Sequence, residues 1–230
     1  MLENLSRQTI SHTMRLIDIS QEISPKTQVF PTYPSPYFML WTKRDIYGFE
    51  AEVMMMAVHT GTHVDAPYHF TPEGRRISEV NPESLIGEAV VVDLSDAADR
   101  ELITLSRFRE SLNRAGTELR EGDIVLVRTG WDRYLGGERY IRDYPGLALD
   151  VAEHLAYKKI AALGVDTPNP DHPDDTSFPV HNTLLPKDIL IIENLTGLER
   201  IPRQRLQFIG LPLKLKGLSG SPIRAVLIEP

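Results

Sequence analysis

Short apolar runs rich in valine, isoleucine and leucine set the strongest limit on how this chain of 230 residues folds. Runs of this length and composition are typical of β-strands, whereas a buried helix needs a longer apolar stretch. The 17 prolines and most of the 15 glycines lie between these runs and are not concentrated in a linker. The predicted strands cover residues 15–20, 52–58, 88–94, 123–130, 160–166, 188–194 and 223–229.

Two segments have the spacing of a helix instead. In residues 105–115 the apolar positions recur every three or four residues, with Thr104 or Ser106 as a cap before them and Gly116 after them. Residues 148–159 show a second helical pattern that leads directly into the strand predicted at 160. The sequence therefore predicts a mixed α/β fold that is rich in strands and has few helices.

The composition is that of an ordinary globular protein, with 41% hydrophobic and 25% charged residues. Because no repeat or hinge-like linker divides the chain, we expect one domain over residues 1–230. No apolar run is long enough to cross a bilayer, and the first residues lack the apolar core of an export signal. We therefore expect a cytoplasmic protein with no membrane partner.

Charge and cysteine content narrow the functions further. The net charge of -7 argues against nucleic-acid binding, which depends largely on clustered lysine and arginine, so a small molecule is the expected partner. The chain has no cysteine, which excludes disulfides, thiolate nucleophiles, iron–sulfur clusters and cysteine-bound zinc. Any metal site must therefore be built from histidines and carboxylates.

Three of the seven histidines fall within the eleven residues 59–69, where simple proportion predicts about a third of one. Gly61 and Pro67 argue against a continuous helix through this segment. The spacing is therefore not the two-histidine helix face of a metalloprotease, and no HExxH signature occurs. Gly61 also allows the backbone to turn tightly between side chains that bind one ion.

In extended backbone, alternate side chains point the same way, which places His59, His63, Asp65 and His69 toward one side. Neutral imidazoles and a carboxylate suit a borderline divalent cation such as zinc or manganese, and the carboxylate can bridge two ions. We therefore interpret the group around Asp65 as a metal site. The isolated histidines, which we interpret as ordinary polar residues, are His12, His154 and His172.

A second polar feature lies downstream, where His181 follows a loop rich in aspartate and proline. Glu193 stands among five aliphatic residues, and a carboxylate in such surroundings needs a partner. It is either part of a site, an edge residue that faces water, or one half of an ion pair with an arginine such as Arg128. Spacing alone does not decide between these alternatives.

The proline-rich residues 25–36 cannot form a regular helix or an inner strand, so we expect an ordered loop there. Aromatic residues cluster in and just after this loop. Such clusters pack together more often than they line a ligand pocket, and we expect packing here. The cluster comprises Phe30, Tyr33, Tyr37, Phe38 and Trp41.

The segment HTGTHVDAPYHF at 59–70 resembles the signature of the cyclase family of metal-dependent hydrolases, which includes bacterial kynurenine formamidases and isatin hydrolases. The resemblance continues in order along most of the chain. It implies a swivelling β/β/α cyclase-like fold and a homodimer or higher oligomer. The other similar stretches are LIDIS and the proline-rich loop, RTGW at 128–131, LGVDTPNPD at 163–171, HNTLLPKDILIIENLTGL at 181–198 and GLPLKLKGLSGSPIRAVL at 210–227.

The resemblance also implies roles for individual residues. It implies one or two ions, Zn²⁺ or Mn²⁺, with Asp65 and Glu193 as bridging ligands and His69 as the residue that transfers protons. The activity that it implies is hydrolysis of an amide bond in a small aromatic substrate. The implied metal ligands are His59, His63, Asp65, His181 and Glu193.

One position departs from the pattern of the kynurenine formamidases. They tend to carry a tryptophan, in a Trp-Pro-Gly-Asp stretch, where this chain reads Phe30-Pro31-Thr32-Tyr33. The tryptophan stacks on the aromatic substrate, and Phe30 offers the same contact over a smaller area. The main expectation is therefore an arylformamidase that acts on N-formyl-L-kynurenine. The alternative within the family is hydrolysis of isatin or of another cyclic amide or lactone.

Other classes of protein remain as alternatives. His63 and Asp65 with the distant His181 also fit the facial triad of a non-haem iron oxygenase. Such a three-ligand site needs neither His59 nor Glu193, and no arginine shortly follows His181 to hold an oxoacid. A structural metal in a non-catalytic binding protein is a second alternative, in which protein ligands close the site. A serine hydrolase is disfavoured because no G-x-S-x-G elbow occurs.

Overall fold

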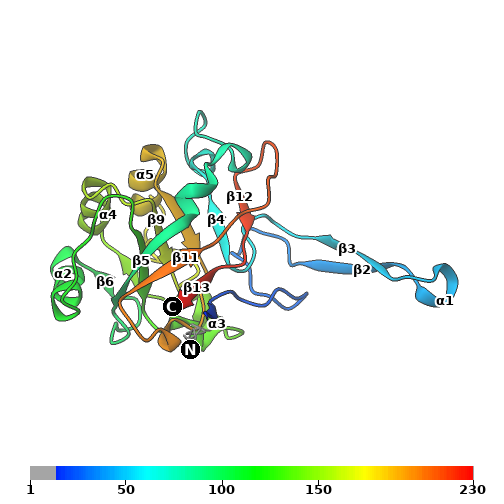
Figure 1. Ribbon diagram of the computed structural model, residues 1–230, viewed down its shortest axis with the longest axis horizontal. Coiled ribbons are helices and arrows are strands. Elements are labelled where there is room, and N and C mark those ends of the chain that lie inside the picture. Colours follow the sequence, from blue (N-terminus) through cyan, green and yellow to red (C-terminus); the bar gives the residue numbers. More distant parts are fainter. Residues whose placement is uncertain (1–13, 230) are drawn as a thin grey trace, which may run out of the picture.

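The computed structural model describes residues 14–229, and nine of the strands in this range form one mixed sheet (Figure 1). In spatial order these strands are β1 (Arg15–Asp18), β13 (Val226–Glu229), β11 (Arg205–Ile209), β5 (Ile86–Asp93), β7 (Ile124–Arg128), β9 (Ala162–Val165), β10 (Leu190–Glu193), β4 (His63–Asp65) and β12 (Gly220–Pro222).

The four central strands β5, β7, β9 and β10 run parallel, and both of their faces are covered. Successive residues of β5 therefore enter two different cores, with Val90 on one side and Val91 on the other. Three helices cover the face that carries Val90, through buried side chains such as Phe108 and Leu155. These helices are α2 (Leu105–Arg114), α4 (Leu149–Tyr157) and α5 (Pro179–Leu184).

The opposite face is enclosed because the sheet curls on itself. Ile17 of the edge strand β1 and Val64 of β4, near the other edge, belong to one buried cluster. Beyond β1 the chain reaches the end of β10, where Ser20 forms an isolated bridge with Leu195. The curl brings the first strand beside the carboxyl end of β10, which is the end that carries Glu193.

Both predicted helices are present, as α2 and α4, and most of the predicted strands lie in the sheet. The strand predicted at 52–58 is only partly correct, because β3 (Ala51–Met55) lies outside the main sheet. It pairs with β2 (Tyr37–Thr42), and α1 (Arg44–Tyr47) closes the hairpin. We call residues 37–55 the arm, because Figure 1 shows them projecting from the body as a narrow ribbon.

The remaining described elements are short. No helix in residues 14–229 is both long enough and apolar enough to span a membrane. The short elements are β6 (Leu102–Ile103), β8 (Gly146–Leu147), α3 (Glu138–Arg142) and the 3₁₀ turns η1 (Pro67–His69), η2 (Ile77–Glu79), η3 (Pro82–Leu85), η4 (Trp131–Tyr134), η5 (Leu185–Lys187) and η6 (Leu198–Arg200).

Gly164 in β9 gives a direct test of this packing. A Cβ atom there would lie 2.7 Å from Leu126 Cδ2 and 2.8 Å from Leu195 Cδ1, which is closer than packed side chains allow. We expect Gly164→Ala to lower the free energy of unfolding by about 1–3 kcal/mol through overpacking, measured by urea denaturation. The matched control is Gly87→Ala in β5, whose Cβ would meet only Ile124 Cδ1 at 3.8 Å. Equal effects of the two substitutions would contradict the packing described here.

Candidate metal centre

The pairing of two strands places the first three polar side chains of the site. β4 runs antiparallel to β10, and His63 lies directly opposite Glu193. Residues in such a pair project from the same face of the sheet, and Asp65, two residues beyond His63, projects from that face as well. The extended backbone predicted from His59 to His69 is confirmed only for residues 63–65; it is wrong at His59, which lies in a turn, and at His69, which lies in the 3₁₀ turn η1.

The fourth side chain comes from a helix packed on this face. His181 lies in α5, which begins after Phe178, a residue in the left-handed backbone region at φ 50°. Asp171 holds this turn, because its Oδ1 accepts a hydrogen bond from the backbone N–H of Val180 at 2.6 Å. The helix thereby directs His181 toward the carboxylates on β4 and β10.

These four side chains form a regular arrangement. His63 Nε2 lies 3.3 Å from Asp65 Oδ1 and 3.3 Å from Glu193 Oε2. His181 Nε2 lies 3.4 Å from Asp65 Oδ2 and 3.4 Å from Glu193 Oε1. Each carboxylate thus presents one oxygen to each imidazole, and all four side chains are buried.

The donor atoms fit a divalent cation. Ligands about 2.0–2.1 Å from a tetrahedral zinc ion lie about 3.3–3.4 Å from one another, a separation similar to the two N···O distances around His63 Nε2. His63 Nε2 and Asp65 Oδ2 are buried without a hydrogen-bond partner among residues 14–229, although such atoms are normally satisfied. His63, Asp65 and Glu193 also lie close enough together to bind one ion.

The charges of the buried side chains also favour a bound cation. Burial opposes ionisation of Asp65 and Glu193, but the surrounding imidazoles hold the pKa of each carboxyl below its usual value. Burial alone would lower the pKa of His63, yet the two carboxylates raise it to about 10. Two buried negative charges therefore need positive charge between them, supplied either by protons on the imidazoles or by a metal ion.

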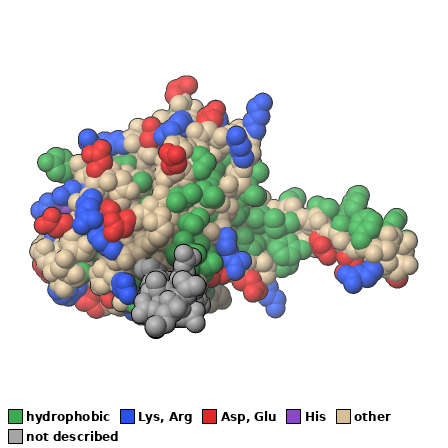
Figure 2. Space-filling view, viewed as in Figure 1, with side chains coloured by type: hydrophobic (Ala, Val, Ile, Leu, Met, Phe, Trp, Pro, Cys, Tyr) green, Lys and Arg blue, Asp and Glu red, His purple; other side chains and the backbone are tan. Residues whose placement is uncertain are grey.

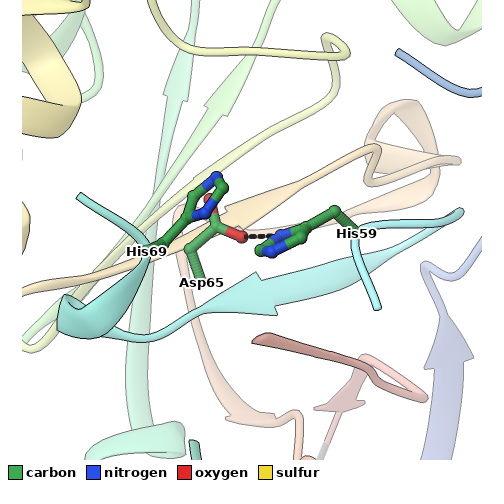
Figure 3. A group of neighbouring side chains, drawn as sticks. All are labelled: His59, Asp65 and His69. Carbon is green, nitrogen blue, oxygen red and sulfur yellow. Dashed lines mark hydrogen bonds and ion pairs between the residues drawn. The ribbon is translucent and has the colours of Figure 1, made fainter. Parts of the chain in front are cut away.

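His59 and His69 lie beside this cluster and flank Asp65 (Figure 3). His59 Nδ1 is 2.7 Å from Asp65 Oδ1, and its Nε2 is 2.8 Å from Ser219 Oγ, so both ring nitrogens contact protein atoms. The ring of His69 stacks on that of His59, with centroids 4.0 Å apart. His59, Asp65 and His69 form a second group that is compact enough for an ion, and Asp65 is common to both groups.

The orientation of each imidazole is fixed from outside the cluster. His63 Nδ1 donates to the carbonyl oxygen of Gly61 at 2.8 Å, and His181 Nδ1 donates to Asp171 Oδ2 at 2.5 Å. These bonds leave both Nε2 atoms free to act as ligands, which is how metal-binding histidines are usually held. The tight turn predicted at Gly61 is confirmed by its φ of 64°.

A further network joins the two strands beside the site. Asn194 follows Glu193 in the left-handed region, at φ 59°. Its carbonyl oxygen accepts a hydrogen bond from Thr62 Oγ1 at 2.5 Å, and its side-chain Oδ1 accepts one from the Tyr140 hydroxyl at 2.8 Å. The residues next to His63 and Glu193 are therefore fixed relative to each other.

A pocket of about 130 Å³ opens above the cluster. Its walls include Phe30, Tyr33 and Phe178, with His69 and His181 at the polar end. Tyr33 stacks on His59 with centroids 5.8 Å apart, and burial raises the pKa of its hydroxyl to about 12.

The expectation that the aromatic cluster packs together is wrong. Phe30 and Tyr33 line the pocket, whereas Tyr37, Phe38 and Trp41 lie exposed on the arm. The chain leaves the pocket wall after Tyr33 and enters β2, so residues that are close in sequence are separated in space.

The structure also tests the predicted ion pair of Arg128 and the interpretation of the isolated histidines. Arg128 pairs with Asp93 at 3.2 Å and not with Glu193, so the ion-pair alternative for Glu193 is wrong. His154 lies beside Arg109 and His172 beside the carbonyl oxygen of Arg100, away from the cluster. His12 lies outside the described residues.

The sequence did not single out Asp171, Tyr33 or Asn194 as members of the site. Asp171 lies in the aspartate-rich loop ten residues before His181, where several carboxylates occur together. Its burial, which distinguishes it from exposed Asp174 and half-buried Asp175, is visible only in the fold.

We expect Asp171→Asn to weaken binding of a divalent cation by about 10–100-fold, the usual effect of losing such a supporting carboxylate. The affinity is measured by competition with a chromophoric chelator. Asp175→Asn is the matched control, because the half-buried side chain of Asp175 lies on the same loop and, among residues 14–229, hydrogen-bonds only to Ser177. Unchanged affinity in Asp171→Asn would show that His181 needs no such support, or that it binds no ion.

The chain is similar to known proteins over nearly its whole length. The Cyclase family model matches residues 17–172. A kynurenine formamidase from Bacillus cereus is 32% identical over 216 residues, which cover 94% of this chain and 98% of the relative. A kynurenine formamidase from Bacillus anthracis is 30% identical over 217 residues, with the same two coverages.

Solved structures agree with this assignment. An isatin hydrolase bound to the product analogue thioisatinate superposes with a TM-score of 0.88 at 27% identity, over 94% of this chain and 93% of that one. A predicted metal-dependent hydrolase from Bacillus stearothermophilus superposes with a TM-score of 0.78 at 28% identity, over 94% and 99% of the two chains. The predicted strand-rich, cyclase-like α/β fold is thereby confirmed. This chain belongs to the Cyclase family.

Proposed function

We propose that this protein is a metal-dependent amidohydrolase that acts as an arylformamidase, with N-formyl-L-kynurenine as its substrate. The observation that carries the proposal is the pair of buried carboxylates, Asp65 and Glu193, each lying between His63 and His181 beneath an aromatic pocket. The kynurenine formamidases that match 94% of the chain support the choice of substrate.

The reaction is hydrolysis of the bond between the formyl carbon and the aryl nitrogen, which yields formate and an arylamine. A divalent cation bound here would supply an acidic water and would polarise the carbonyl group. His63, Asp65, His181 and Glu193 would hold one ion or two. His59 is a further candidate ligand through its position beside Asp65.

We assign the transfer of the proton to His69. Burial lowers the pKa of His69 to about 4 although the charge of Asp65 opposes this shift, so its imidazole is neutral at pH 7. A neutral imidazole accepts a proton from water as the general base. It then delivers that proton to the leaving nitrogen, which departs poorly as an anion.

The pocket wall supports an aromatic substrate. Phe30 lines the pocket with Tyr33 beside it at a centroid distance of 6.2 Å, and we expect Phe30 to contact the ring of the substrate. A second candidate reaction is the opening of the cyclic amide isatin, which the structural likeness to isatin hydrolase favours. Both reactions use the same site chemistry, so the substrate alone distinguishes them.

The two other classes fit the site less well. A facial-triad oxygenase needs three ligands, whereas Glu193 approaches both His63 and His181 as a fourth. A purely structural metal does not require a pocket, yet the cluster here forms the floor of one. The finer predictions stay as proposals: zinc or manganese as the metal, a cytoplasmic location, a single domain over residues 1–230 and a homodimer or higher oligomer.

The decisive experiment combines metal analysis with a substrate panel. We expect the purified protein to carry zinc or manganese and to hydrolyse N-formyl-L-kynurenine faster than isatin and simple aryl formamides. Release of formate and of the arylamine is followed separately. Faster turnover of isatin would support the cyclic-amide alternative instead. Iron-dependent oxygen uptake would indicate an oxygenase.

Metal removal distinguishes a catalytic ion from a structural one. We expect dialysis against a chelator to abolish turnover while the far-UV circular dichroism is retained, because two packed cores hold the fold. Zinc or manganese should then restore activity. Unfolding on loss of the metal would instead indicate a structural site.

His69→Ala tests the residue assigned to proton transfer. We expect turnover to fall by about 10²–10⁴-fold, the usual contribution of a general acid–base, while metal content stays unchanged. His154→Ala is the matched control, because His154 lies on α4 away from the pocket. A parallel loss of metal and activity would place His69 among the ligands.

A further inference from the structure

Two asparagine side chains line the pocket beside the metal cluster. Asn194 directly follows Glu193, and Asn169 lies two residues before the buried Asp171. The backbone N–H of Asn194 donates to the carbonyl oxygen of Thr167 at 3.0 Å, so the two segments lie side by side. Asn194 and Asn169 are both more than nine-tenths buried, with exposed fractions of 8% and 6%.

The side-chain oxygen of each asparagine is already used by the protein. Asn169 Oδ1 accepts a hydrogen bond from the backbone N–H of Asp171 at 2.7 Å, and Asn194 Oδ1 accepts one from the Tyr140 hydroxyl at 2.8 Å. Burial raises the pKa of Tyr140 well above its usual value, so its hydroxyl keeps the proton that it donates. These bonds fix which end of each amide is the oxygen, and the other end is the NH₂ group.

The two NH₂ groups have no such partner. Neither Asn169 Nδ2 nor Asn194 Nδ2 donates a hydrogen bond to another of residues 14–229, and neither atom is sealed inside the protein. Side chains buried to this degree normally use all of their polar atoms. Because both residues line the pocket, it presents two oriented hydrogen-bond donors that the protein leaves unused.

Gln28, in another part of the pocket wall, provides a contrast. Its Nε2 donates to the carbonyl oxygen of Gly137 at 2.8 Å, and its Oε1 accepts from the backbone N–H of Gly136 at 2.9 Å. Both ends of this amide are held by the protein. The free donors are therefore specific to the two asparagines and are not shared by every amide in the pocket.

The charges around the pocket favour a neutral hydrogen-bond acceptor as the ligand of these donors. The lining residues, which all belong to the described part of the chain, include no lysine or arginine. Basic side chains lie on the outer surface of the body, as Figure 2 shows for one face of the molecule. A carboxylate beside Asp65 and Glu193 would have no basic partner in the wall, whereas a carbonyl oxygen needs only the two N–H donors.

We propose that Asn169 and Asn194 form a subsite for a second carbonyl group of the substrate, bonded to the ring carbon next to the one that carries the amide nitrogen. This role rests on the proposed function, in which an aromatic amide is hydrolysed at the cluster. N-formyl-L-kynurenine and isatin both carry a carbonyl group at this ortho position, so the subsite suits either substrate. An ortho carbonyl lies close to the amide that is hydrolysed, and Asn194 is correspondingly next to Glu193.

Two isomeric formamides test the subsite. The acetyl carbonyl is ortho to the amide nitrogen in 2-formamidoacetophenone and para to it in 4-formamidoacetophenone, with a similar electron-withdrawing effect. We expect the metal-loaded native protein to show a kcat/KM about 10–100-fold higher for the ortho isomer, the usual effect of two hydrogen bonds. Equal values for the two isomers would overturn the subsite and leave the proposed amide hydrolysis in place.

Substitutions then assign the preference to the two amides. Asn169→Asp and Asn194→Asp keep the Oδ1 atom and replace only the NH₂ group, and Asn169→Ala removes the donor without adding a charge. Each should lower the ortho-to-para ratio by about 3–10-fold, while circular dichroism and metal content stay native. Gln28→Ala, the matched control, should keep the native ratio. An equal fall in kcat/KM for both isomers would overturn the proposal, because the donors would then act on the scissile carbonyl or on the fold.

Calorimetric titration with the arylamine products gives a measurement that does not depend on turnover. We expect 2-acetylaniline to bind the native protein about tenfold more tightly than 4-acetylaniline, and Asn169→Ala to abolish this preference. Equal binding of the two amines by the native protein would overturn the subsite even if both formamides are hydrolysed. A preference for the ortho amine in a protein that hydrolyses neither formamide would support the subsite and contradict the proposed function.

Discussion

Two ionised carboxylates buried side by side are the constraint on which this structure depends. Asp65 and Glu193 are buried, and their charges repel across the space between His63 and His181. Such a pair is costly unless a cation lies between the two groups. Each carboxylate offers one oxygen to each imidazole. A divalent ion bound between these groups would offset the cost of burying the two negative charges.

The fold brings three segments that are distant in sequence together at one end of the sheet, where they form this site. The antiparallel register of β4 and β10 sets His63 against Glu193, and α5 supplies His181 from above. Hydrogen bonds to the Gly61 carbonyl and to Asp171 direct the imidazoles inward. Apolar cores on both faces of the sheet hold these elements in place.

Much of the fold and of the candidate site was predictable from the sequence, and each wrong prediction has a physical cause. Local composition indicated the parallel strands, because a strand buried on both faces is apolar throughout. The spacing of His63 and Asp65 predicted their common side, since alternation is a local property. The pairing of Glu193 with His63 depends on strand register between segments 130 residues apart, which no local pattern encodes. The residues at 52–55 have the composition of a buried strand, yet they are exposed on the arm.

The central claim is that the space between His63, Asp65, His181 and Glu193 binds a divalent cation. Anomalous diffraction from crystals of the purified protein, recorded at the zinc and manganese absorption edges, tests it most directly. The account predicts an anomalous peak within coordinating distance, about 2.0–2.2 Å, of His63 Nε2 and of an oxygen from each carboxylate. Well-ordered density that shows only water between these side chains, in protein supplied with both metals, would contradict it.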